Sequence, residues 1–327
     1  MASADQIKAL LKSHAEGDEE RFYSIALQIA AQAALHGHSR IAEEMRDIVD
    51  SVKSRTVRKA ESRGELGGLL SVADSEIRLS QMTLAENIKA SLSRVLLEQR
   101  QRHKLRAHGL APRNKLLLVG PPGSGKTMTA FALAAEMGVP VCTIQLDALI
   151  TKFMGETAAK LRTIFDEIRR VRGVYFFDEF DAIGGRRTST NDVGEIRRVL
   201  NSFLQFIEQN HHDSVIISAT NHPELLDRAL FRRFDDVIEY SYPTPQLALG
   251  VLKERLSTVE SEQLKMSEIV IAARGLSFAD LVKACEDSIK ESVLSGKPIT
   301  SEFLTRSLQA RKGLGLMAKN GRIQRKS

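Results

Sequence analysis

Short apolar runs alternate with amphipathic stretches through the middle of this 327-residue chain. Stretches with helical spacing separate the runs, and strands joined by helices form parallel sheets that are covered on both faces. After Pro243 and Pro245 the strand-like runs cease, and residues 246–310 have helical patterns only. The pattern therefore predicts an α/β core with helices on both faces, followed by a C-terminal helical lid. The five predicted strands are residues 115–119, 139–146, 174–177, 215–219 and 237–240.

The N-terminal part of the chain has helical spacing throughout. Apolar residues such as Ile41, Met45 and Ile48 fall on one stripe, and Ser39 is a candidate N-cap for their helix. Three helices near residues 4–15, 19–36 and 39–54 would form a small bundle whose default role is docking. The polar, glycine-containing stretch that follows is typical of a linker. We therefore divide the chain into a bundle (1–54), a linker (55–80), a core (81–243), a lid (244–312) and a basic flexible tail (313–327).

The formal charge of +6 comes from 47 basic and 41 acidic residues, and its location decides how it is interpreted. Residues 311–327 hold six Lys or Arg and no acid, so this segment accounts for the whole excess. A basic terminal segment is typical of a solvated end, with nucleic-acid contact as the less favoured alternative.

Other classes of protein are disfavoured by what the sequence lacks. No apolar run approaches the length that crosses a bilayer, and the N-terminus lacks the order of a secretion signal, so a cytoplasmic location is expected. Cys142 and Cys285 stand apart from any CxxC or Cys/His cluster, which favours buried apolar packing over metal binding.

The segment GPPGSGKT lies directly after the first predicted strand of the core and before a helix-prone stretch. This order of strand, glycine-rich loop and helix is that of a nucleoside triphosphate site. Backbone N–H groups of such a loop point at phosphate oxygens, Lys126 reaches the outer phosphates, and the Thr127 hydroxyl can ligate Mg²⁺. A plain connecting turn would not need Lys-Thr at its end, so we predict binding of ATP or GTP. The predicted phosphate loop is Gly120, Pro121, Pro122, Gly123, Ser124, Gly125, Lys126 and Thr127.

Two carboxylates and an amide follow the next strands of the predicted sheet. Asp178 and Glu179 come directly after the run VYFF, at the strand end where ligands bind in open parallel sheets. Asp178 would hold Mg²⁺, and Glu179 would orient and deprotonate the water that attacks the γ-phosphate. Asn221 ends the following strand, where it could hydrogen-bond the γ-phosphate, although Asn is also a common turn former. Together with the phosphate loop, these residues predict hydrolysis rather than binding alone.

The order of these motifs resembles the AAA family of ATPases, within the wider AAA+ class. GPPGSGKT, YFFDEFDAI, ISATNHPELLDRAL, RRFD and GLSFADL occur in the family's order within residues 81–311. The resemblance implies a homo-oligomeric ring, usually a hexamer, with ATP and Mg²⁺ bound between neighbouring subunits. It also implies that the phosphate loop is Walker A, Asp178 and Glu179 are Walker B, and Asn221 is sensor 1.

The resemblance further implies that arginines reach the neighbour's site from the segment DRALFRRFD, with Arg232 and Arg233 as the candidates. A guanidinium supplied in this way is worth about a thousandfold or more in rate. The stretch is shorter than the family's usual R-x-G-R-F form, and adjacent arginines can also form a plain surface patch. The sequence leaves open which of the two acts.

Two further segments resemble the family and bear on what kind of partner the protein acts on. Phe153, Met154 and Gly155 follow the second predicted strand and are similar to the family's pore loop, which grips an extended polypeptide, although Phe-Met in a loop can also be a buried anchor. In GLSFADL, Ala279 stands where other AAA+ branches place a second sensor arginine, which favours the protein-remodelling branch. Ser277 and Asp280 can equally be explained as a helix capping box.

The leading hypothesis is an ATP-driven protein remodeller that acts on a partner protein. The layout also resembles stand-alone bacterial ATPases encoded beside subtilisin-like serine proteases in toxin-antitoxin or phage-defence pairs, which implies control of a separate protease. A nucleotide-controlled binding switch without threading is one alternative. A DNA-associated ATPase that uses the basic tail is another.

Overall fold

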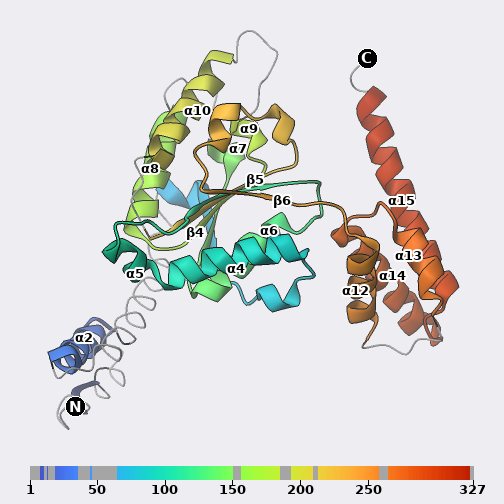
Figure 1. Cartoon of the computed structure of the whole chain (residues 1–327), viewed down its shortest axis with the longest axis horizontal. Helices are drawn as coiled ribbons and strands as arrows, with labels where there is room; N and C mark the ends of the chain where they lie inside the picture. The colour runs from blue at the N-terminus through green and yellow to red at the C-terminus, as the bar shows by residue number, and fades with distance from the viewer. Residues whose placement is uncertain are drawn as a thin grey trace.

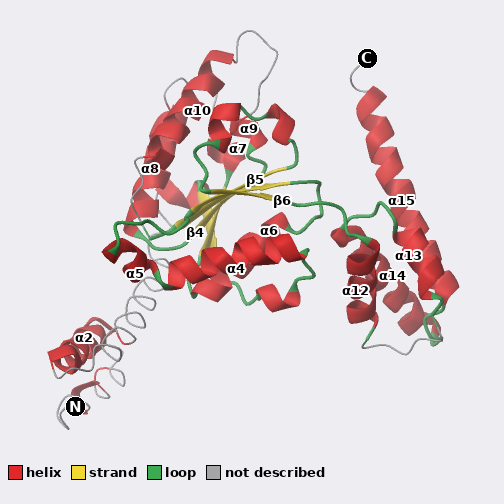
Figure 2. Cartoon of the chain, viewed as in Figure 1, coloured by secondary structure: helices red, strands yellow, loops and turns green. Residues whose placement is uncertain are grey.

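The structure is a computed structural model, and it describes residues 8–10, 13, 19–35, 45, 65–149, 156–184, 193–208, 213–257 and 264–324. A six-stranded sheet forms the centre of the core, in the order β1-β3-β4-β5-β2-β6, with helices on both of its faces (Figures 1 and 2). Strands β2 to β6 run parallel, which confirms the predicted fold class. The strands are β1 (Leu70–Ala73), β2 (Lys115–Val119), β3 (Val141–Ile144), β4 (Val174–Phe177), β5 (Val215–Thr220) and β6 (Asp236–Glu239).

The helices that the structure describes fall into those of the core and those that follow it. In the core they are α4 (Glu86–Arg100), α5 (Arg102–Ala107), α6 (Lys126–Met137), α7 (Leu146–Leu149), α8 (Glu156–Arg170), α9 (Asp181–Gly184), α10 (Val193–Glu208) and α11 (Arg228–Phe231). Short 3-10 turns are η1 (Glu65–Gly68), η2 (Leu79–Gln81) and η3 (Pro223–Leu225). The lid consists of α12 (Pro245–Leu256), α13 (Met266–Ala273), α14 (Phe278–Ser295) and α15 (Ser301–Gln324), as predicted.

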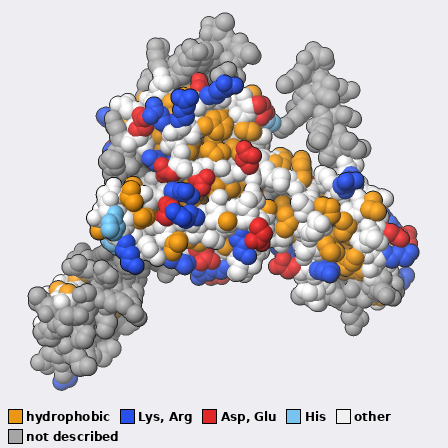
Figure 3. All heavy atoms as spheres, viewed as in Figure 1, with side chains coloured by type: hydrophobic (Ala, Val, Ile, Leu, Met, Phe, Trp, Pro, Cys, Tyr) orange, Lys and Arg blue, Asp and Glu red, His pale blue; other side chains and the backbone are white. Residues whose placement is uncertain are grey.

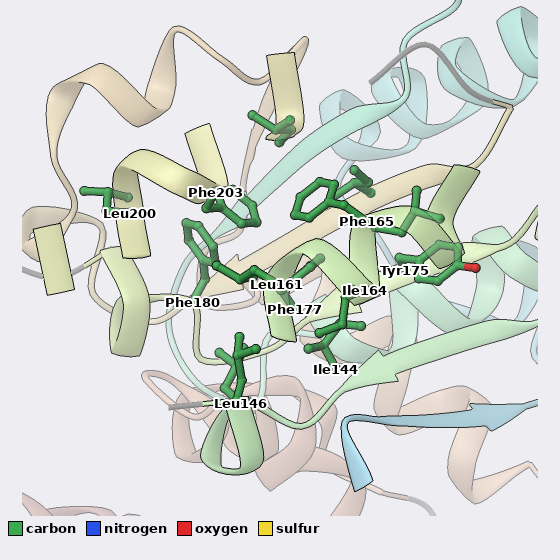
Figure 4. Close-up of a cluster of buried hydrophobic side chains, with 14 of the residues drawn as sticks. Ile144, Leu146, Leu161, Ile164, Phe165, Tyr175, Phe177, Phe180, Leu200 and Phe203 are labelled. Carbon is green, nitrogen blue, oxygen red and sulfur yellow. The ribbon is translucent and has the colours of Figure 1, made fainter. Parts of the chain in front are cut away.

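Side chains that alternate along each strand build a separate apolar cluster on each face of the sheet. Leu116 and Leu118 of β2 pack toward α4 and α6, whereas Leu117 packs toward α8 and α10. On the second face, aromatic rings such as Phe177 of β4 and Phe203 of α10 meet edge to face at 5.4 Å between centroids (Figure 4). Burial of each such side chain contributes about 1.5–3 kcal/mol, so the sheet is held from both sides.

The sheet begins earlier in the chain than the sequence predicts. Residues 55–80 are predicted to be a linker, but β1 pairs antiparallel with β3, with Leu70 opposite Ile144 and Ala73 opposite Val141. The strand is only four residues long, and its middle residues Ser71 and Val72 are exposed, so no apolar alternation marks it. Ser71 and Val72 point to opposite faces of the sheet, and a short edge strand that is exposed on both faces leaves little hydrophobic signal in a sequence.

The end of the chain also differs from the prediction. Helix α15 continues to Gln324, whereas the sequence suggests a flexible tail over residues 313–327. The segment holds helix formers such as Leu314, Leu316 and Lys319, but also Gly313, Gly315 and Gly321, so local propensity alone does not account for this extension of the helix that begins in the lid.

Both cysteines are buried, as the sequence predicts, and neither is part of a disulfide. Burial raises the pKa of the Cys285 thiol in α14 to about 11, which keeps it protonated and unreactive at neutral pH. Within the described part of the chain, no helix combines the length and the apolar character that a bilayer crossing requires.

The predicted N-terminal bundle is only partly described. Its middle helix is α2 (Glu19–Leu35), where Ala26 is buried against Leu10, Phe22 and Leu27. Most of the other two predicted helices, near residues 4–15 and 39–54, lies outside the described residues.

Candidate functional site

The phosphate loop connects β2 to α6 at the carboxyl edge of the sheet. Gly125 adopts a left-handed conformation (φ 102°) and forms the N-cap of α6, so that Lys126 and Thr127 begin the helix. At Gly120 the φ angle is 149°, and a Cβ atom there would collide with the carbonyl group of Tyr240. Only glycine fits this approach. The N-terminus of α6 thus opens toward the loop, an arrangement that favours anions.

Lys126 is held inside the loop with 6% of its surface exposed. Its Nζ donates hydrogen bonds to the carbonyl oxygens of Gly120 (2.8 Å) and Pro121 (2.9 Å) and to Oδ1 of Asn221 (2.8 Å). The last bond links two predicted site residues that are 95 positions apart in the sequence. It places Asn221, at the end of β5, directly beside the phosphate loop.

Burial lowers the pKa of Lys126, while the carboxylates of Asp178 and Asp181 act in the opposite direction. Asp181 is a residue that the sequence analysis missed. Its Oδ1 accepts a hydrogen bond from the Thr220 hydroxyl (2.8 Å), which fixes the end of β5 next to Asn221. The available signal was the third acidic residue of the run DEFD, three positions after Asp178.

Thr127 and Asp178 form the candidate magnesium site. The Thr127 hydroxyl donates to Oδ2 of Asp178 at 3.0 Å, so two oxygen ligands from different elements already face one point. Mg²⁺ is usually bound by one or two protein oxygens together with substrate phosphates and water. This donor set therefore fits Mg²⁺.

Glu179 has an unusual backbone conformation. Among the described residues it is the only non-glycine with positive φ (49°), and its N–H donates to Oδ1 of Asp178 at 2.9 Å. A left-handed conformation at such a residue costs on the order of 1–2 kcal/mol and is typical of functional positions. The turn leaves the Glu179 side chain exposed to solvent at the end of β4. There its carboxylate can take a proton from a water molecule.

Arg232 and Arg233 lie at the opposite edge of the sheet. They precede β6, whose first residue Asp236 lies beside Leu116 near the start of β2. Arg233 forms an ion pair with Glu208 at the end of α10, whereas no ion pair of Arg232 occurs among the described residues, and its side chain is exposed. The geometry therefore separates both arginines from the phosphate loop of their own chain.

A cavity of about 910 Å³ also lies at this amino edge of the sheet. Its carboxylates Asp213, Asp235 and Glu208 are already paired with Arg106, Lys115 and Arg233. The candidate phosphate loop lies at the carboxyl edge instead.

The lid touches the phosphate loop through the N-terminus of α14. Ala279 N–H donates to the Gly123 carbonyl at 3.1 Å. The predicted capping box is confirmed: Ser277 Oγ accepts from Asp280 N–H (3.2 Å), and Asp280 Oδ2 accepts from Ser277 N–H (3.1 Å). A Cβ at Gly123 would lie 2.6 Å from Ser277 Oγ, which shows how closely the two segments approach.

Ser277→Ala is expected to destabilise the protein by about 1 kcal/mol, because it removes the helix cap. It should also weaken ATP binding, since the helix end that it loosens contacts the phosphate loop. Thermal unfolding and titration with a fluorescent ATP analogue would measure the two effects. Thr300→Ala is the matched control, because Thr300 Oγ1 accepts a hydrogen bond from the Phe303 N–H (3.2 Å) at the start of α15 in the same way, and it should lower stability alone. Equal ATP affinity in the two variants would contradict the role of this contact.

The predicted pore loop, Phe153, Met154 and Gly155, lies outside the described residues. On the face drawn in Figure 3, positive and negative side chains are interspersed over the core. No broad single-sign surface of the kind that binds nucleic acid appears on that face.

Comparisons with known proteins find a matching family model and relatives over most of the chain. The family model "ATPase family associated with various cellular activities (AAA)" matches residues 116–242. An uncharacterised AAA family ATPase of Sinorhizobium fredii, y4kL, is 33% identical over 317 residues, which cover 94% of this chain and 95% of that protein. The crystal structure of the FIGL-1 AAA domain superposes with a TM-score of 0.60 over 74% of this chain and 85% of that one. At 22% identity this shows a shared fold.

Other relatives match over shorter regions. The ATP-dependent zinc metalloprotease FtsH of Lancefieldella parvula is 33% identical over 72% of this chain, but the match covers 38% of that protein. The proteasome-activating nucleotidase of Methanoregula boonei is 34% identical over 59% of this chain and 47% of its own length. The chain therefore spans less than half of these two relatives.

Proposed function

Because this chain belongs to the AAA family of ATPases, which bind ATP with Mg²⁺ and hydrolyse it, we propose that it couples hydrolysis in a homo-oligomeric ring, most simply a hexamer, to the remodelling of a partner protein. The observation that carries this proposal is the convergence of Lys126, Asp178 and Asn221 on one point at the carboxyl edge of the sheet. A loop that only connected a strand to a helix would not draw these groups together.

In the proposed reaction, backbone N–H groups of the phosphate loop and Lys126 hold the β- and γ-phosphates. Thr127 and Asp178 hold Mg²⁺, which neutralises charge on the phosphate oxygens when bound. Glu179 accepts a proton from water as the water oxygen forms a bond to the γ-phosphorus. The bond between that phosphorus and the bridging oxygen breaks, and ADP and phosphate leave. Asn221, beside Lys126, is placed to orient the attacking water.

The position of the arginines supports a site that is shared between two subunits. Strands β2 and β6 run parallel, so residues before β6 and the loop after β2 lie at opposite edges of the sheet. An arginine at the amino edge can therefore serve a neighbouring subunit in a head-to-tail ring. Since Arg233 is already paired with Glu208, we assign the trans role to Arg232.

The partner is proposed to be a polypeptide that the ring grips with Phe153, Met154 and Gly155. Two relatives are named for proteolysis, one as a metalloprotease and one as a nucleotidase that activates the proteasome. These names support the further proposal that this chain controls a separate protease. The subtilisin-like proteases of toxin-antitoxin and phage-defence pairs are the partner class that the layout of the chain suggests.

An unfolded model polypeptide tests the remodelling proposal. Fluorescein-labelled casein is expected to raise the ATPase rate of the wild type, because a gripped chain is drawn through successive subunits. Phe153→Ala should keep its basal ATPase activity, since the residue lies away from the phosphate loop in sequence, but should lose most of the stimulation by casein. Phosphate release with and without casein measures both quantities, and Phe303→Ala in α15, which is part of neither the pore loop nor the phosphate loop, controls for the loss of an aromatic ring.

The same assay separates the alternatives. Casein without effect on either protein would favour a nucleotide-controlled binding switch. Stimulation by double-stranded DNA instead, lost on deletion of residues 313–327 and weakened by salt, would favour the DNA-associated ATPase.

A further inference from the structure

We propose that Tyr240 and Thr129 form a positioning pair that fixes the end of the phosphate loop and ties it to the strand that leads into the lid. This inference rests on the proposed ATP site and not on the proposed remodelling. Neither residue belongs to a motif that the sequence analysis identified, and the two are 111 positions apart.

The two hydroxyl groups form a directed chain of hydrogen bonds. Thr129 Oγ1 donates to the carbonyl oxygen of Gly125 at 3.0 Å, and it lies 2.7 Å from the hydroxyl of Tyr240. When the Thr129 Oγ1 proton points at the Gly125 carbonyl, which also accepts from the Thr129 N–H at 2.9 Å, the Tyr240 hydroxyl donates to Thr129. In this arrangement the order is Tyr240 to Thr129 to the Gly125 carbonyl.

This chain of hydrogen bonds is closed off from water. Thr129 is fully buried, and Tyr240 is 5% exposed within the apolar cluster of β2, β5 and α6. Burial raises the pKa of Tyr240 to about 12, so its hydroxyl stays protonated and remains a donor at physiological pH. Two apolar side chains could fill the same space without the cost of burying hydroxyls. The polar pair therefore calls for an explanation other than packing.

Tyr240 also holds the beginning of the phosphate loop. Its N–H donates to the Val119 carbonyl at 2.7 Å, and its own carbonyl occupies the space where a side chain at Gly120 would lie. One residue thus touches the loop where it starts, and through Thr129 also where it ends at Gly125. A shift of Tyr240 would move both ends together.

The same residue stands at the entrance to the lid. Tyr240 directly follows β6, and four residues later Thr244 caps α12, the first helix of the lid. Movement of the lid would pull on the segment between these two points. The pair is therefore placed to resist distortion of the phosphate loop when the lid moves, and to transmit the lid's position to Gly125, the N-cap of α6. In this role Tyr240 and Thr129 position Lys126 and do not touch the substrate.

Removal of either hydroxyl tests the proposal. Tyr240→Phe and Thr129→Val are each expected to weaken binding of a fluorescent ATP analogue and to raise KM for ATP by about five- to tenfold, the effect of one neutral hydrogen bond. The kcat should change less than about twofold, because Glu179 and the magnesium ligands stay in place. Thr129→Ser, which keeps the hydroxyl, should restore the wild-type KM.

The double variant and a matched control make the test decisive. Tyr240→Phe with Thr129→Val should resemble either single variant, because both changes break one chain of hydrogen bonds. Tyr175→Phe is the control: its buried hydroxyl has one proton, which it donates to the Val171 carbonyl (2.9 Å) with the Glu167 carbonyl as a second acceptor nearby (3.2 Å), in the other apolar cluster. It should lower the melting temperature without changing KM. If Tyr240→Phe also lowered only the melting temperature, or if the two single effects were additive, the positioning role would be refuted.

Discussion

Replacing Glu179 with Gln is expected to lower kcat for ATP hydrolysis by about 10²- to 10⁴-fold, the usual contribution of a general base. ATP binding should persist, because the amide keeps the shape of the side chain and the phosphate loop is untouched. The left-handed turn at this residue should also survive, since its hydrogen bond to Asp178 comes from the backbone N–H. Single-turnover phosphate release and titration with a fluorescent ATP analogue would separate the chemical step from binding.

Glu239→Gln is the matched control, because Glu239 is an exposed glutamate at the carboxyl end of β6, on the same edge of the sheet. Its kcat should stay within about twofold of the wild type, as expected for an exposed surface substitution. A decrease in kcat of less than about tenfold in Glu179→Gln would mean that another group takes the proton.

Arg232→Ala is expected to lower kcat by about a thousandfold through the loss of a cation supplied to the neighbour's site. Complementation between two inactive variants would be direct evidence that two neighbouring subunits share one ATP site. A site formed by Glu179 of an Arg232→Ala subunit and Arg232 of a Glu179→Gln subunit has every group intact. In an equimolar mixture, about a quarter of the interfaces should be of this kind, because each neighbour is of the required type half of the time. Activity should therefore reappear on mixing.

Arg233→Ala serves as the comparison. It should remove only an ion pair with Glu208 between half-exposed side chains, which contributes about 0–1 kcal/mol, and it should leave kcat nearly unchanged. If mixing the two inactive variants restored no activity while each still bound ATP, hydrolysis would not depend on a neighbouring subunit. If Arg233→Ala lost activity and Arg232→Ala did not, the assignment of the two arginines would be reversed.

Periodicity and local motifs were sufficient to predict most of the fold. The parallel strands are buried on both faces, so each appears in the sequence as an unbroken apolar run such as VYFF in β4. Strand β1 escaped this test because it has only four residues, and the two in the middle, Ser71 and Val72, are exposed on opposite faces. The continuation of α15 was missed because the positive charge and the three glycines of this segment suggest a solvated, irregular end.

In the candidate site, too, the sequence could predict some residues and not others. Groups adjacent to a strand end, such as Lys126, Asp178 and Asn221, could be predicted because the topology brings strand ends together. The contacts of Tyr240 with Thr129 and of Arg233 with Glu208 depend on side chains from distant segments, and neither residue pair shares a motif. No local pattern encodes such a pairing. The role of Phe153 remains a prediction, since it lies outside the described residues.

The place of β1 at the margin of the sheet matters for anyone who shortens this protein. A fragment that began at residue 81, where the linker was expected to end, would lack β1 and uncover the backbone N–H and C=O groups of β3. Such a bare strand margin is a template for pairing with a second molecule, and β3 is apolar and short of charge. We therefore expect the shortened ATPase to aggregate by pairing of its exposed β3 strands. Self-association of this fragment would not be evidence for ring formation by the 327-residue chain.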